Sequence, residues 1–174
     1  MTSRDLLIDA FGRIPDQVHG VIDGMTPDQL TYRLDSEANS IAWLVWHLSR
    51  IADDHVADVS GHPQVWTSAG WAKRWGLPFD FADTGYGHTA GQVAAVTGTP
   101  EMLRGYFDAV HEATIRFVRT VSDSDLDRIV DERWDPPVTL GIRLVSVVGH
   151  NFEQAAQAAY VRGILERKEL HSTR

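Results

Sequence analysis

The chain has 174 residues, of which 43% are hydrophobic and 23% charged, a balance typical of globular proteins rather than disordered chains. Its formal net charge is −8, so the sequence does not indicate the basic surface of a nucleic-acid-binding protein. It contains no cysteine, which excludes disulfides, thiolate metal ligands and a cysteine nucleophile from this sequence.

The first half of the chain predicts two long helices. Apolar residues recur every three or four positions over residues 4–25, where Pro15 is expected to kink or split the helix. Residues 26–30 begin with threonine and proline, which predicts a short extra turn. A second apolar periodicity begins at residue 39 or 40 and continues to about residue 59, which predicts the second helix.

Residues 64–98 are rich in glycine and aromatic residues and weak in helical period, apart from a turn expected at residues 92–96. Long loops inside domains are usually functional or disordered, and the aromatic content favours order. We therefore expect a long ordered crossover. We interpret three of its residues as packing residues first and pocket wall second: Trp66, Trp71 and Trp75.

The second half of the chain predicts two further long helices. The third begins at residue 99 and has the cleanest amphipathic pattern in the sequence, and a capped short turn follows at residues 122–126. The sequence Asp135-Pro136-Pro137 breaks the chain before the fourth helix, expected at residues 139–168. Because no strand alternation is convincing, these elements predict an all-α four-helix bundle with a long aromatic crossover between the second and third helices.

Polar residues on two of these helices are candidates for chemistry. Between residues 143 and 162 the only charged residue is Glu153, so we expect most of the fourth helix to be buried. His150, Gln154 and Gln157 form one polar stripe along it. On the second helix, His47 lies on or beside the apolar face. A neutral imidazole there is a metal ligand, a proton carrier or a hydrogen-bonded core residue, and the residues alone favour the last.

Three segments are distinctive: Trp-Leu-Val-Trp-His-Leu at residues 43–48, Thr-Gly-Tyr-Gly-His-Thr at 84–89 and Gln-Ala-Ala-Tyr-Val-Arg-Gly at 157–163. Together they resemble the DinB-like superfamily, and in particular an actinobacterial branch of it. The resemblance covers nearly the whole chain and implies a DinB-like four-helix bundle. It also implies a divalent metal, zinc or nickel, held by a second-helix histidine and two last-helix residues four apart.

His47 and His150 match two of the metal-ligand positions of that superfamily, and Gln154 stands where it usually has another histidine. An amide oxygen is a weaker ligand than imidazole for zinc-like ions, so we expect metal affinity to be reduced or lost. Glu153 is the substitute favoured by ligand chemistry, because residues three apart lie close on a helix.

Some members are similar to thiol S-transferases that use mycothiol or bacillithiol, and a related family comprises mycothiol-dependent maleylpyruvate isomerases. The resemblance thus implies a metal-dependent transferase that conjugates mycothiol, a small-molecule thiol, to electrophiles. A metal-free, catalytically degenerate bundle that binds a small molecule is the alternative, and a mycothiol-dependent isomerase is a minor one. Residues expected near the substrate pocket are Trp43, His88, Gln157 and Arg162.

Other polar residues are interpreted as structural. His55 and His111 are expected to be core or margin histidines, whereas Asp53 and Asp54 either orient a ligating imidazole or are solvated. Because no signal peptide or apolar span is evident, we expect one cytoplasmic domain over residues 1–174 without membrane or nucleic-acid partners. A homodimer is an open alternative for a bundle of this kind, although no apolar surface stripe demands one.

Overall fold

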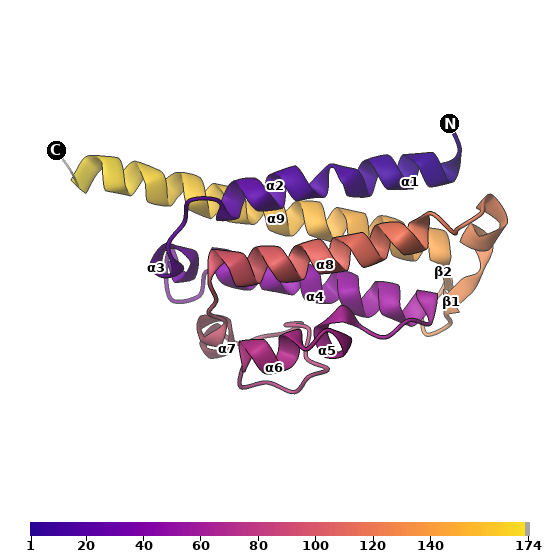
Figure 1. Cartoon of the computed structure of the whole chain (residues 1–174), viewed down its shortest axis with the longest axis horizontal. Coiled ribbons are helices and arrows are strands. Elements are labelled where there is room, and N and C mark those ends of the chain that lie inside the picture. The colour runs from indigo at the N-terminus through magenta and orange to yellow at the C-terminus, as the bar shows by residue number, and fades with distance from the viewer. Residues whose placement is uncertain (173–174) are drawn as a thin grey trace.

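The computed structural model describes residues 1–172 and is built around four long helical columns (Figure 1). The first column consists of α1 (Ser3–Gly12) and α2 (Ile14–Ile22), and the others are α4 (Ile41–Ser60), α8 (Pro100–Val118) and α9 (Leu140–Ser172). In Figure 1, α4 and α8 run in one direction, and the first column and α9 run in the other. The predicted all-α bundle is confirmed.

The split of the first column follows from its sequence. Helix α1 ends at Gly12, and Pro15 lies in the first turn of α2, where a missing amide hydrogen removes no intrahelical bond. The predicted extra turn is α3 (Pro27–Thr31). Thr26 caps it by accepting a hydrogen bond from the Gln29 amide while the Gln29 side chain accepts from the Thr26 amide, a reciprocal capping box.

Helix α4 lies at the centre of the molecule and is buried along most of its circumference. Ser40 caps its N-terminus by accepting from the Trp43 amide, and Gly61 ends it in a left-handed conformation. It packs against α9 and α8 on one side, and the crossover covers its other side. A side chain on α4 is therefore surrounded by three different parts of the fold.

The crossover after α4 is ordered, as predicted, and more helical than expected. The expected turn is α7 (Ala90–Ala95), and α5 (Val65–Ser68) and α6 (Trp71–Trp75) form where the sequence showed little helical period. Asp53 explains α5, because its carboxylate accepts from the Val65 and Trp66 amides, 2.8 and 2.7 Å away. This side chain lies on another helix, so the local sequence does not reveal the contact.

A small antiparallel hairpin lies between η1 (Asp123–Asp127) and α9, where no strand was expected. Its strands are β1 (Ile129–Asp131) and β2 (Val138–Thr139), with Ile129 opposite Thr139. Strands of three and two residues are too short for alternation to be visible in the sequence. The expectation of no strand is corrected, but the fold class is unchanged.

Helix α9 was expected to be buried on most of its circumference, and this is wrong. Three of its large side chains are exposed, by 52% at Ile142, 64% at Val145 and 66% at Tyr160. The helix packs against α4 and the first column, so its outer face is open. A shortage of charge along a helix does not by itself indicate burial on every side.

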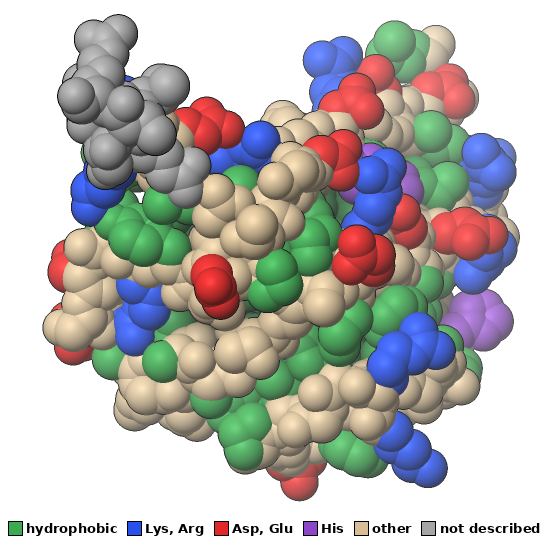
Figure 2. Space-filling view, turned by 60° about the vertical axis from the view of Figure 1, so that its left-hand side comes forward, with side chains coloured by type: hydrophobic (Ala, Val, Ile, Leu, Met, Phe, Trp, Pro, Cys, Tyr) green, Lys and Arg blue, Asp and Glu red, His purple; other side chains and the backbone are tan. Residues whose placement is uncertain are grey.

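The surface is mixed in character. Figure 2 shows hydrophobic side chains reaching the surface in the middle of one face, with charged side chains mainly toward its edges. Within residues 1–172, none of the helices combines the length and the apolar character needed to span a membrane.

Candidate metal centre

The structure brings His47 and His150 together at the interface of α4 and α9. Their ring centroids are 4.9 Å apart and the rings are nearly perpendicular, at 79°. Only 5% of His47 is exposed, because α9, α4 and the crossover enclose it. Two imidazoles predicted from separate helices therefore lie against each other, with His47 buried and His150 half-buried.

The hydrogen bond of His47 fixes the state of its ring. Its Nδ1 lies 2.6 Å from the backbone oxygen of Thr84, which only accepts, so Nδ1 carries the proton and Nε2 keeps its lone pair. Trp43 stacks on the ring with centroids 4.5 Å apart and an angle of 19°. This is the tautomer that a histidine adopts when Nε2 binds a metal.

Both histidines are held in the neutral form. Burial lowers the pKa of His47 to about 4, although the hydrogen bond to Thr84 opposes the shift. Burial also lowers the pKa of His150, with a smaller effect from nearby His55. At neutral pH, each ring is neutral and has one nitrogen lone pair available to bind a metal.

Among the described residues, four buried side-chain polar atoms have no hydrogen-bond partner; Trp46 Nε1 and Asn151 Oδ1 are two, and the other two belong to candidate ligands. These two are Nε2 of His150 and Oε1 of Gln154. A buried polar atom left unpaired costs about 1–3 kcal/mol, so its persistence calls for an explanation. Neutral imidazole nitrogens are common ligands of divalent cations, and an amide oxygen is a weaker one.

Glu153 does not complete this donor set. Its side chain is exposed on the outer face of α9. In the part of the chain that the structure describes, no group of three or more His, Cys, Asp and Glu side chains is placed to hold a metal. Gln154 is then the remaining candidate of the three positions that the sequence indicated.

His88 was expected to line the pocket, but in the structure it lies behind Trp43 and hydrogen-bonds to Trp43 and Asp83. Its side chain is 2% exposed, and its Nε2 lies 3.0 Å from Oδ1 of Asp83. Its Nδ1 accepts from Nε1 of Trp43 at 3.1 Å. Both ring nitrogens are engaged, so His88 supports Trp43 and has no free nitrogen for a ligand.

A groove of about 550 Å³ lies between the loop before α4 and α9, and neither His47 nor His150 is among its lining residues. Leu44 in this groove is three residues before His47, and Gln157 is three residues after Gln154. The groove is mainly apolar, with hydrogen-bonding side chains at Asn39, Gln157 and Tyr160. Gln157 lines this groove, one turn of α9 beyond Gln154.

Arg162 points elsewhere. Its Nη1 donates to the backbone oxygens of Gly20 and Asp23, 2.7 and 2.8 Å away, and its Nε donates to Glu166. These oxygens lie at the C-terminal end of α2, where carbonyls lack intrahelical partners. The structure thus places Arg162 in the packing of α9 on α2, away from the groove that Gln157 lines.

The two aspartates weighed as orienting carboxylates do not hydrogen-bond to His47. Asp53 accepts from the crossover backbone and from the hydroxyl of Tyr106 at 2.9 Å. Burial raises its pKa, and these donors counteract the shift. Asp54 accepts from the side chain of Gln64. Their role is to hold the crossover.

His55 and His111 have structural surroundings, as expected. Nδ1 of His55 accepts from Arg143 at 2.9 Å, and Arg143 also pairs with Asp131. His111 stacks on Phe107, with centroids 5.8 Å apart. The three crossover tryptophans also pack as interpreted, with Tyr106 at the centre of their cluster.

Sequence reasoning missed the residues that fix His47. Thr84 contributes only a backbone oxygen, and Asp83 supports the same turn by accepting from the Gly85 amide at 2.7 Å. Arg50, fully buried on α4, donates to the backbone oxygen of Asp83 at 3.1 Å. The signal available in the sequence was the closely spaced pair Gly85 and Gly87, which is typical of a tight turn. In the structure both have positive φ values, 90° and 73°.

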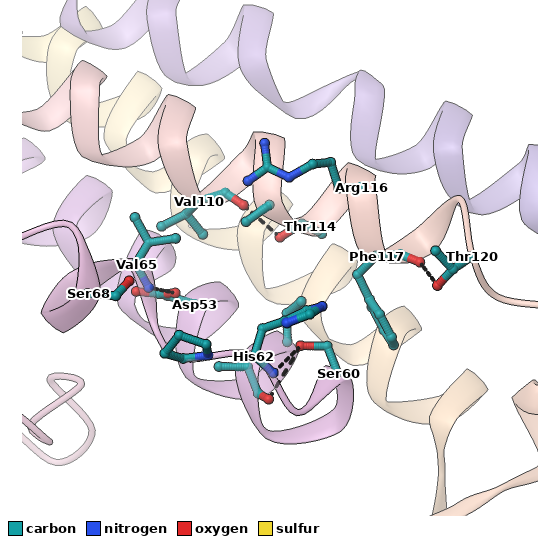
Figure 3. A pocket seen from close by; sticks show the side chains of 14 residues that line it. Asp53, Ser60, His62, Val65, Ser68, Val110, Thr114, Arg116, Phe117 and Thr120 are labelled. Atoms are coloured by element: carbon teal, nitrogen blue, oxygen red, sulfur yellow. Dashed lines mark hydrogen bonds between the residues drawn. The ribbon is translucent and has the colours of Figure 1, made fainter.

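A second groove, of about 460 Å³, lies between α4, α5 and α8 (Figure 3). Asp53 lines it with satisfied hydrogen bonds, and Arg116, another lining residue, pairs with Glu112. Among the described residues, none of the buried side-chain atoms without a hydrogen bond belongs to this groove. The histidine pair is therefore the stronger candidate site.

Comparison with known proteins agrees with this fold. A family model described as the DinB superfamily matches residues 10–158. A solved structure, described as a conserved protein from Enterococcus faecalis, aligns over 93% of this chain and 96% of its own, with a TM-score of 0.87 and 24% identity. No curated protein matches. The family match spans most of the sequence, and the chain belongs to the DinB superfamily.

Proposed function

We propose that His47, His150 and Gln154 bind one divalent cation, zinc or nickel, and that the chain is a thiol S-transferase. It would conjugate a low-molecular-weight thiol, mycothiol, to an electrophile. The observation that carries the proposal is the pair of unpartnered buried atoms, His150 Nε2 and Gln154 Oε1, beside an imidazole in the ligand tautomer.

The protein contributes a pre-formed, neutral donor set. His47 is fixed by Thr84 and by stacking on Trp43, so little side-chain entropy is lost on binding a cation. A bound divalent cation would supply a Lewis acid that favours the thiolate form of an added thiol. The sulfur must come from outside this sequence, because it contains no cysteine.

The groove between the loop before α4 and α9 suits a small polar ligand. Its lining is mostly uncharged, and Glu37 is the one lining residue with a charged side chain at neutral pH. Asn39, Gln157 and Tyr160 offer donors and acceptors suited to a hydroxyl-bearing thiol such as mycothiol. The apolar remainder of the groove suits the carbon skeleton of an electrophile.

The first test is metal content per chain by plasma mass spectrometry, on protein purified without a histidine tag. The wild type, His47→Ala and the exposed control His62→Ala are compared after incubation with zinc, nickel or manganese. Near-stoichiometric metal in the wild type and His62→Ala, lost in His47→Ala, is expected. Transfer of mycothiol to a bimane should follow the same order. Wild-type protein without metal and without conjugation would refute the proposal.

A second candidate is a metal-free bundle that binds a small molecule. The specific observation in its favour is the amide at Gln154, which is a weaker ligand than a third imidazole. Calorimetric titration of mycothiol into protein kept in a chelator discriminates the two. Binding unaffected by the chelator favours the metal-free bundle, whereas binding that requires zinc favours the transferase.

A further inference from the structure

The segment Asp83–His88 packs against the Nδ1 side of the His47 ring. Asp83 organises this segment, since its Oδ1 lies 2.7 Å from the Gly85 amide and 3.0 Å from Nε2 of His88. Between the two, Thr84 presents its backbone oxygen to Nδ1 of His47. The carboxylate thus sets the direction of the one oxygen that hydrogen-bonds to the imidazole.

The segment is tied to α4 at two further points. Arg50 donates from Nε to the backbone oxygen of Asp83 at 3.1 Å and from Nη2 to that of Phe81 at 3.4 Å. Trp43 donates from Nε1 to His88 and stacks on His47. The contacts form a closed circuit from His47 through Trp43, His88 and Asp83 to Thr84.

Gly85 allows the segment to approach so closely. A Cβ atom there would lie 2.8 Å from Nδ1 of His47 and 2.9 Å from Cζ3 of Trp46, distances that real side chains do not adopt. Gly87 has a similar positive φ, but a Cβ there meets nothing within 4 Å. The two glycines share a backbone requirement, and only one of them is needed for close approach.

We propose that the Asp83–His88 segment is a positioning device that locks His47 as the Nδ1–H tautomer and leaves Nε2 free to bind the cation. Asp83 and Gly85 are its positioning residues. The role toward the cation rests on the proposed function, whereas the tautomer is a property of the metal-free protein. Outer partners of ligating histidines typically change metal affinity by about 10- to 100-fold.

The test begins with metal-free protein in a chelator at neutral pH. Long-range proton–nitrogen NMR spectra of the imidazole rings report which nitrogen of His47 is protonated. The wild type and Gly87→Ala are expected to show a single Nδ1–H tautomer, and Gly85→Ala a mixture. Asp83→Ala should also give a mixture, and Asp83→Asn should restore the single form because its amide oxygen still accepts.

The second readout is zinc affinity, measured by competition with a coloured chelator. Affinity about 10- to 100-fold weaker than wild type is expected in Gly85→Ala and Asp83→Ala, with Gly87→Ala unchanged. Circular dichroism identifies any variant that fails to fold. If Gly85→Ala fails to fold, the comparison of Asp83→Ala with Asp83→Asn decides the test. A single Nδ1–H tautomer in both Gly85→Ala and Asp83→Ala would overturn the inference. Absence of zinc binding by the wild type would refute the proposed function, and the tautomer measurement would still decide the positioning role.

Discussion

The rings of His47 and His150 stand nearly perpendicular with their centroids 4.9 Å apart, although the two residues come from opposite halves of the sequence. Burial keeps both neutral, so the pair avoids the repulsion of two imidazolium ions. Neither ring satisfies the other, because Nε2 of His150 has no hydrogen bond among the described residues. Such a pair is better suited to binding a cation than to stabilising the metal-free bundle.

Gln154→His is expected to raise zinc affinity by about tenfold or more, because imidazole is a stronger ligand than an amide oxygen for zinc-like ions. Gln154 is one helical turn after His150 on α9 and its Oε1 is buried and unpartnered, so the replacement starts from a suitable place. Competition with a coloured chelator measures the change. Gln157→His, three residues further along α9 and exposed, is the matched control and should gain much less. Equal gains in both variants would contradict the assignment of Gln154 as a ligand position.

Arg50→Met is expected to destabilise the fold by about 3–5 kcal/mol, because it leaves Asp53 buried without its cation. Arg50 is fully buried, and its Nη1 lies 3.6 Å from the carboxylate of Asp53. Urea unfolding measures the loss. Arg13→Met removes an exposed ion pair with Asp9 and should cost less than about 1 kcal/mol. A similar small cost at both positions would show that the crossover does not depend on Arg50.

Much of the bundle could be predicted because its signals are local. Helical periodicity located α4 and α8, and the caps at Ser40 and Thr99 marked their beginnings. His47 and His150 could be proposed as partners only through resemblance, and the structure brings them together. Their convergence depends on how α4 packs against α9, which the periodicity of either helix alone does not determine.

The features that could not be predicted from the sequence depend on contacts between segments that are distant along the chain. Helix α5 begins where Asp53 accepts its amides, and Arg162 completes the end of α2 from across the bundle. The oxygen that fixes His47 belongs to the backbone of Thr84, and a backbone oxygen has no side-chain signature in the sequence. The outer face of α9 was misjudged because low charge is compatible with exposure.

Stability should fall as the pH drops below about 6.5, and His111 should account for part of this fall. Burial lowers its pKa in the folded state, with Asp108 opposing and His19 reinforcing the shift. A histidine whose folded pKa is depressed binds fewer protons than in the unfolded chain, so its stabilisation is complete above pH 6.5 and is lost as the pH falls toward the folded pKa. Thermal unfolding from pH 7.5 to 5 measures the trend. His111→Gln should make stability depend less steeply on pH. An unchanged dependence would contradict the contribution assigned to His111.

Arg162→Ala is expected to cost about 1–3 kcal/mol of stability, because it removes two hydrogen bonds from a charged donor to the backbone oxygens of Gly20 and Asp23. Arg167→Ala, an exposed change on the same helix, should cost little in urea unfolding. Calorimetric titration of mycothiol in the presence of zinc provides the second measurement. Arg162→Ala should keep the wild-type affinity, whereas Gln157→Ala should weaken it because Gln157 lines the groove between the loop before α4 and α9. Weaker mycothiol binding by Arg162→Ala at unchanged stability would instead support the pocket role expected from the sequence.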